Sequence, residues 1–98
     1  MAIVAVFQDP TLTQEIYEQS VQGLTDGKKK RMEAAGDWPV QGLLAHIAGQ
    51  GPKGFRVVDV WESEEAFQRF GDHLMPIMEK LGVHVEPEIY PTFAFVSG

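Results

Sequence analysis

The 98-residue sequence contains no cysteine, which excludes disulfides, thiolate metal sites and a cysteine nucleophile. It is also poor in basic residues, since 8 Lys and Arg stand against 14 Asp and Glu, giving a net charge of -6. An acidic chain is a poor candidate for non-specific binding to nucleic acid or to anionic membranes. Its apolar start, residues 1–7, is too short to span a membrane. We therefore expect a cytoplasmic protein whose residues 1–98 form a single domain.

Patterns that bind metals or cofactors are also missing. The three histidines, His46, His73 and His84, are far apart in the sequence, and no His-x-x-x-His pair or carboxylate cluster accompanies them. The basic run at residues 28–31 has no interleaved aromatics and no glycine-rich phosphate loop, so it is read as a solvated surface. The sequence predicts neither a metal nor a cofactor.

The apolar spacing of the chain predicts six elements. Spacing of two is typical of strands, and spacing of three and four is typical of helices. Strands are expected over 2–7, 41–49, 55–61 and 88–96, and helices over 11–24 and 64–81. Residues 28–40 fit either a short helix or a solvated loop. Pro76 predicts a kink, or a break with a restart near Met75, and Pro91 predicts an edge or a bulge.

The resulting order is strand, helix, strand, strand, helix, strand. This order is the split βαβ pattern of an α+β, ferredoxin-like antiparallel sheet with two helices on one face. The other face carries large apolar side chains on the middle and last strands, too many to leave in water. A second copy of the sheet would cover them, so we predict a homodimer with twofold symmetry.

Two polar residues interrupt otherwise apolar strands. In the strand 41–49, His46 shares a face with Leu44 and Ala48, whereas Leu43 is expected on the opposite face. Asp59 lies between two valines in the neighbouring strand. A buried carboxylate needs a partner, and a pair of His46 with Asp59 is geometrically conceivable, although the register cannot be fixed from the sequence.

The segments Gly42-Leu-Leu-Ala-His-Ile-Ala-Gly49, Gly54-Phe-Arg-Val-Val-Asp-Val-Trp-Glu-Ser-Glu-Glu-Ala-Phe67 and His73-Leu-Met-Pro76 resemble those of a known superfamily. It comprises the small dimeric α+β barrel proteins related to antibiotic biosynthesis monooxygenases. The resemblance covers the chain in element order and is sharpest over residues 41–77. It implies a ligand cavity between helices and sheet, and activities that include cofactor-free oxidation of electron-rich phenols or quinols.

The resemblance also includes a haem-degrading branch, which uses an asparagine on strand one, and a tryptophan and an axial histidine on helix two. This chain has no asparagine in its first strand. Phe70 stands where the tryptophan would fall, and Lys80 stands where the histidine would fall. The sequence therefore disfavours haem degradation.

Catalysis, if present, is assigned to His46 as a base toward a phenolic hydroxyl and to Asp59 as its partner. The alternative is a structural ion pair in the core or at a dimer interface. Expected ligand contacts have aromatic or polar side chains and could equally be core or surface residues. They are Trp61, Phe67, Phe70, His73 and Tyr90.

Two functions remain open for this sequence. The first is a cofactor-independent monooxygenase, or a related enzyme that modifies a small hydrophobic aromatic or polyketide-like molecule. The second is a noncatalytic small-ligand-binding or dimeric assembly protein, which equally explains the lack of a nucleophile or cofactor motif. A cavity that holds His46 and Trp61 together would favour the enzyme, and side chains that fill this space would favour the second function.

Overall fold

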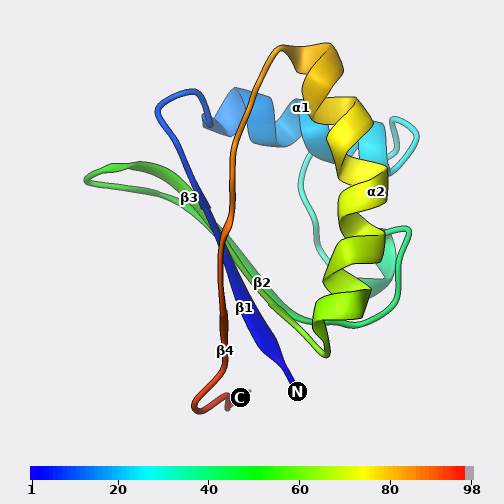
Figure 1. Cartoon of the computed structure of the whole chain (residues 1–98). Helices are drawn as coiled ribbons and strands as arrows, with labels where there is room; N and C mark the ends of the chain where they lie inside the picture. The colour runs from blue at the N-terminus through cyan, green and yellow to red at the C-terminus, as the bar shows by residue number, and fades with distance from the viewer. Residues whose placement is uncertain (97–98) are drawn as a thin grey trace.

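The computed structural model of the chain describes residues 1–96. Its antiparallel sheet has four strands in the order β2-β3-β1-β4, and two α-helices lie on one side of it (Figure 1). The strands are β1 (Ile3–Gln8), β2 (Leu43–Gly51), β3 (Gly54–Trp61) and β4 (Glu88–Pro91), and the helices are α1 (Gln14–Leu24) and α2 (Glu64–Leu81). This topology confirms the α+β, ferredoxin-like fold.

The helix boundaries follow from their capping residues. Thr13 Oγ1 accepts the Ile16 amide at 3.2 Å at the start of α1, and Ser63 Oγ accepts the Ala66 amide at 3.1 Å at the start of α2. Helix α2 ends at Gly82, whose φ of 69° lies in the left-handed region that glycine adopts without strain. No helix within residues 1–96 is long and apolar enough to cross a membrane.

Helix α2 continues through Pro76, so the predicted break and restart near Met75 is wrong. Proline removes the amide that would bond to the carbonyl of Asp72. Both Asp72 and Pro76 are exposed, so water can hydrate this carbonyl. The helix therefore tolerates the proline on its solvent side.

Strand β2 contains an irregularity that the sequence did not reveal. Leu43 pairs with Trp61 and Ala45 pairs with Val60, so Leu44 is an additional residue at a β-bulge. The bulge places Leu43 on the helix-covered face, where it is buried. The prediction that Leu43 lies on the face opposite His46 was therefore wrong.

The last strand is shorter than the predicted 88–96. Strand β4 pairs with β1 only as far as Pro91. The next residue, Thr92, bonds to the carbonyl of Ala2 through both its amide, at 3.0 Å, and its hydroxyl, at 3.1 Å. Phe93 and Phe95 then lie outside regular structure and are exposed.

The two faces of the sheet differ in their covering. The buried core lies between one face of the sheet and the helices, and it includes Ala5, Phe7, Val57, Trp61 and Phe70. The strand register places a second set of mostly aliphatic side chains on the opposite side, which we call the open face. Its aliphatic and aromatic members are Val4, Val6, Ala45, Ile47, Val58, Val60 and Tyr90, and the polar side chains of Gln8, Arg56 and Glu88 lie on the same side. Ile47 is 66% exposed there, so an apolar side chain of this face lies in solvent.

Between α1 and β2 the chain runs through residues 28–40, which we call the strap. Its regular structure is one 3-10 turn, Ala35–Asp37, so neither a short α-helix nor a featureless loop describes it. It begins after Thr25, whose hydroxyl accepts the Lys29 amide at 3.1 Å. It ends before Gly42, whose carbonyl accepts the Glu62 amide at 2.8 Å. Both ends of the strap are thus fixed to regular elements.

Candidate functional site

His46 and Asp59 are direct partners across β2 and β3. The His46 Nδ1 atom lies 2.6 Å from Asp59 Oδ1, and the carboxylate is almost wholly buried, with 1% of its residue surface exposed. An ionised carboxylate can only accept hydrogen bonds, so Nδ1 carries a proton. The pair that the sequence made conceivable is therefore formed.

A second residue extends this pair. The hydroxyl of Tyr17, on α1, lies 2.7 Å from His46 Nε2. When His46 is neutral and protonated at Nδ1, its Nε2 atom is an acceptor, so the tyrosine hydroxyl donates to it. The result is a continuous polar chain from Asp59 through His46 to Tyr17, which we call the relay.

Trp61 holds the inner end of the relay. Its Nε1 donates to Asp59 Oδ2 at 3.3 Å, and its side chain is fully buried, with 0% exposed. The carboxylate thus receives one donor on each oxygen, as a buried charge requires. Phe70 stacks on the indole at a centroid distance of 5.0 Å, which fixes the ring.

Tyr17 lies in an environment that disfavours its anion. Burial raises the pKa of its hydroxyl above the ordinary value of 10.0, and the negative charge of Asp59 acts in the same direction. The Met32 amide, which donates to the Tyr17 oxygen at 3.4 Å, opposes this pKa shift. Tyr17 therefore rests as a neutral donor to His46.

A small cavity of about 50 Å³ adjoins the relay, between the helices and the sheet. Apolar side chains from β1, α1, β3, α2 and the strap dominate its wall, and we call it the inner cavity. Its lining comprises Phe7, Leu12, Tyr17, Ser20, Val21, Leu24, Trp38, His46, Val57, Asp59, Phe70, Leu74 and Met78. A cavity of roughly 150 Å³ holds benzene in an engineered protein, so a ring enters here only if lining side chains move.

A larger hollow of about 330 Å³ reaches the relay from the protein surface, between α1, the strap and the β2–β3 hairpin. We call it the outer hollow. Tyr17 and His46 line both the inner cavity and the outer hollow. These two side chains therefore form the partition between an apolar interior and an open surface site.

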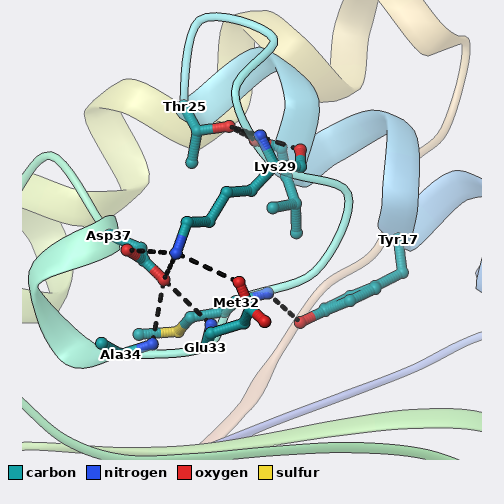
Figure 2. Close-up of polar contacts among 8 residues, drawn as sticks. Tyr17, Thr25, Lys29, Met32, Glu33, Ala34 and Asp37 are labelled. Atoms are coloured by element: carbon teal, nitrogen blue, oxygen red, sulfur yellow. Dashed lines mark hydrogen bonds and ion pairs between the residues drawn. The ribbon is translucent and has the colours of Figure 1, made fainter.

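The strap closes over Tyr17 and is held by its own polar contacts (Figure 2). Lys29 Nζ lies 3.1 Å from Asp37 Oδ1 and 3.2 Å from Glu33 Oε1. The second oxygen of Asp37 accepts the amides of Glu33 and Ala34, each at 2.9 Å. These amides lower the pKa of Asp37, and its carboxylate raises the pKa of Lys29. The contacts keep the Met32 amide on the Tyr17 hydroxyl.

The predicted site residues differ in where they lie. His46, Asp59 and Phe70 meet at the inner cavity. Trp61 is not among the residues that line the cavity, and it reaches the site through its hydrogen bond to Asp59. Phe67 packs in the core against Phe7 and Trp61, outside the cavity lining.

The other two predicted contacts lie farther out. His73 is exposed on α2 and borders a surface hollow with Pro39 and Arg69. Tyr90 pairs with Val4 on the open face, so it points away from the inner cavity. Neither side chain joins the relay.

Two residues at the site were not predicted from the sequence, Tyr17 and Trp38. Tyr17 has the helical spacing of a core residue, and its polar role depends on a partner 29 positions away. Trp38 belongs to the strap, which has no periodic pattern. A tryptophan beside a proline in an otherwise irregular segment was the available signal for Trp38.

Metal binding finds no support in the described part of the chain. No group of three or more His, Cys, Asp or Glu residues within 1–96 is arranged to hold a metal ion. The partners of His46 are Asp59 and Tyr17, and those contacts occupy both of its nitrogens.

The chain matches no protein-family model, and no curated protein is similar to it in sequence. A solved structure is similar in fold: a protein of Chloroflexus aurantiacus J-10-fl named "putative Antibiotic biosynthesis monooxygenase". The TM-score is 0.58, over 98% of this chain and 95% of that chain, at 12% sequence identity. At this identity the likeness shows the fold alone. It agrees with the fold that the sequence resemblance implied.

Proposed function

We propose that this protein is a cofactor-independent monooxygenase that acts on a small, electron-rich hydrophobic aromatic molecule. The observation that carries the proposal is the Asp59–His46–Tyr17 relay, which stands between an apolar cavity and an open hollow. Such a site combines a base with a water-poor chamber, and the fold is that of a protein named as a monooxygenase.

The relay removes a proton from the substrate. Tyr17 passes its hydroxyl proton to His46 Nε2 and takes the acidic proton of the substrate, so the net charge appears on the imidazole. Asp59 stabilises this imidazolium and keeps the ring oriented, as a carboxylate does in a catalytic triad. Because the Tyr17 hydroxyl occupies His46 Nε2, His46 acts through Tyr17 rather than directly.

The substrate anion then reduces dioxygen. For an anthrone-like substrate, a ring CH2 group and O2 give a ring carbonyl and water. The carbon loses two hydrogens and four electrons, one oxygen atom becomes the carbonyl, and the other leaves as water. His46 returns its proton during the loss of water. The apolar walls exclude competing solvent, and the substrate itself supplies the electrons.

We also propose that the protein works as a homodimer through the open face. The aliphatic side chains of β1, β2 and β3 there form one surface, and Ile47 at its exposed end supplies an apolar group for a partner. Two copies of this face related by a twofold axis would cover each other. Light scattering at micromolar concentration tests this proposal, and a monomer would contradict it.

The noncatalytic alternative has two observations in its favour. Trp61 is absent from the lining of the inner cavity, so this cavity does not hold it together with His46. The inner cavity, at about 50 Å³, is filled by side chains to the point that a ring requires movement of its wall. A protein that binds a ligand at the outer hollow, or that only forms a dimer, does not need a larger inner cavity. The relay then serves only to satisfy a buried carboxylate.

The deciding experiment measures oxygen uptake with anthrone- and quinol-like compounds. We expect consumption by the parent protein and at least a 100-fold lower rate for His46→Gln, since general-base catalysis contributes about that much or more. His84→Gln is the matched control, because His84 is exposed and distant from the relay. If no compound is consumed, or if both variants match the parent, catalysis by the relay is ruled out.

A further inference from the structure

Trp38 carries a buried donor without a protein acceptor. Its residue surface is only 7% exposed, yet among the described residues 1–96 its Nε1 atom has no hydrogen-bond partner. An indole N–H can only donate, and native proteins leave few buried donors unpaired. In contrast, the other indole of this chain, Trp61, has Asp59 as its acceptor. The unpaired nitrogen of Trp38 therefore requires an explanation.

Trp38 is also part of the inner cavity wall. Its ring meets His46 edge-on, with centroids 5.6 Å apart, and lies 5.7 Å from the ring of Phe70. The other polar side chains of this wall are committed. Tyr17, His46 and Asp59 bond within the relay, and Ser20 donates to the Ile16 carbonyl at 2.8 Å. Among the described residues that line this cavity, Trp38 is the one whose buried side-chain donor has no partner.

The strap holds this indole by specific contacts. Trp38 follows the 3-10 turn directly, and its amide donates to the Ala35 carbonyl at 3.4 Å. The Asp37 carboxylate before it is held by Lys29 and two backbone amides, and its side chain is only 15% exposed. These contacts fix the backbone next to the tryptophan, so its ring is presented at a defined place above His46.

We infer that Trp38 is a specificity-determining residue whose Nε1–H binds a carbonyl or phenolate oxygen of the ligand in the inner cavity. The ligand class is a compact aromatic molecule with an acceptor oxygen attached to the ring. Its apolar body meets Phe70, Leu74 and Met78, and its oxygen meets the indole. The inference rests on the ligand-binding part of the proposed function and is independent of whether oxygen chemistry follows.

The polarity of the site supports this assignment. Tyr17 already donates to His46 and receives the Met32 amide, so it has no second proton for a ligand oxygen. A ligand acceptor at Trp38 would satisfy the indole without disturbing the relay. A hydrocarbon of the same shape would leave the indole unpaired, and the site would discriminate against it.

The test compares acetophenone with isopropylbenzene, which have nearly the same shape but differ in the carbonyl oxygen. Binding to the parent protein and to Trp38→Phe is measured by calorimetry, because this substitution keeps an aromatic ring and removes the N–H. We expect the parent to prefer acetophenone and the variant to lose about five- to tenfold in affinity for it, the range expected for one hydrogen bond. Affinity for isopropylbenzene should change by less than about twofold.

A second measurement does not depend on the stability of the variant. In the 15N-labelled parent, acetophenone should shift the indole N–H resonance of Trp38 downfield, and isopropylbenzene should leave it in place. If Trp38→Phe loses the same affinity for both ligands, or if both ligands shift the resonance equally, Trp38 contributes only apolar packing. Failure of the parent to bind either ligand would also overturn the inference.

The outcomes separate this inference from the catalytic proposal. A ligand preference that depends on Trp38, without oxygen uptake for any anthrone or quinol, would leave the inference standing and remove the monooxygenase. Oxygen uptake without a ligand preference that depends on Trp38 would support the monooxygenase and overturn the inference about Trp38.

Discussion

The two faces of the sheet use opposite chemistry. The helix-covered face buries a carboxylate, an imidazole and an indole N–H in contact with one another. The open face presents valines, an isoleucine, an alanine and Tyr90, and its charged residues Arg56 and Glu88 are exposed. A buried polar relay costs desolvation free energy that an aliphatic core avoids. This cost falls on the covered face, beside a cavity, where the proposed chemistry requires it, and the proposed dimer uses the open face.

The strongest test of this contrast removes the inner end of the relay. Asp59→Ala leaves His46 Nδ1 and Trp61 Nε1 buried without their acceptor. We expect a loss of about 3 to 5 kcal/mol in unfolding free energy, the range for breaking a buried pair. Asp72→Ala, at an exposed position of α2, is the control and should stay within about 0.5 kcal/mol. Urea denaturation measures the unfolding free energy of both variants. Similar losses would show that Asp59 contributes no more to stability than an exposed carboxylate of α2.

The two tyrosines provide a matched pair, one on each face. Tyr17→Phe removes a hydroxyl that both His46 and the Met32 amide use, so we expect a loss of about 1 to 3 kcal/mol in unfolding free energy. Tyr90→Phe should change the same quantity by less than about 0.5 kcal/mol. The sequence marked Tyr90 as a ligand contact, so reduced ligand binding in Tyr90→Phe would restore that assignment and weaken the contrast between the faces.

A charge on the open face should affect association and leave the fold intact. Ile47 is 66% exposed, so Ile47→Glu should keep the unfolding free energy of the single chain within about 0.5 kcal/mol. In the proposed dimer the same carboxylate would be buried, so the mass from light scattering should fall from two chains to one. Gln50→Glu is the control, because Gln50 is also exposed and lies on the other face of β2. A variant that remains dimeric would place the interface elsewhere.

The smallest expected effect concerns the strap, which completes the covered face. The pKa of Asp37 is lowered from 3.8, so its contacts stabilise the fold above about pH 4 and are lost as pH falls through the lower, folded-state pKa. Asp37→Asn should lower Tm at pH 7 by less than about 4 °C, because the ion pair is partly exposed. The difference from the parent should shrink as the pH falls below about 4 and the Asp37 carboxylate takes up a proton. A difference that persists there would contradict the assignment to this carboxylate.

The regular part of the fold was predictable because its signals are local. Alternating and helical spacing, with Ser63 at the change between them, located three strands and both helices close to their true positions. The errors arose where tertiary contacts decide. Pro76 faces water and is tolerated, the Leu44 bulge moves Leu43 to the covered face, and Thr92 bonds to Ala2 in place of extending β4.

The site was only partly predictable for the same reason. His46 and Asp59 stood out because each interrupts an apolar strand, but their pairing depends on the register of two strands. Tyr17 resembled a core residue, and nothing local shows that its hydroxyl meets His46. Trp38 lies in a segment whose shape comes from the contacts of Asp37, which no spacing rule describes.

The strap is attached at Thr25 and at Gly42, and the register of β2 against β3 is set beyond the second of these points. Its length and sequence can therefore change without shifting His46 relative to Asp59. The strap and the His46–Asp59 pair can therefore change separately in evolution. Substitutions within residues 28–40 would alter the side chains beside the inner cavity and leave the pairing of His46 with Asp59 in place.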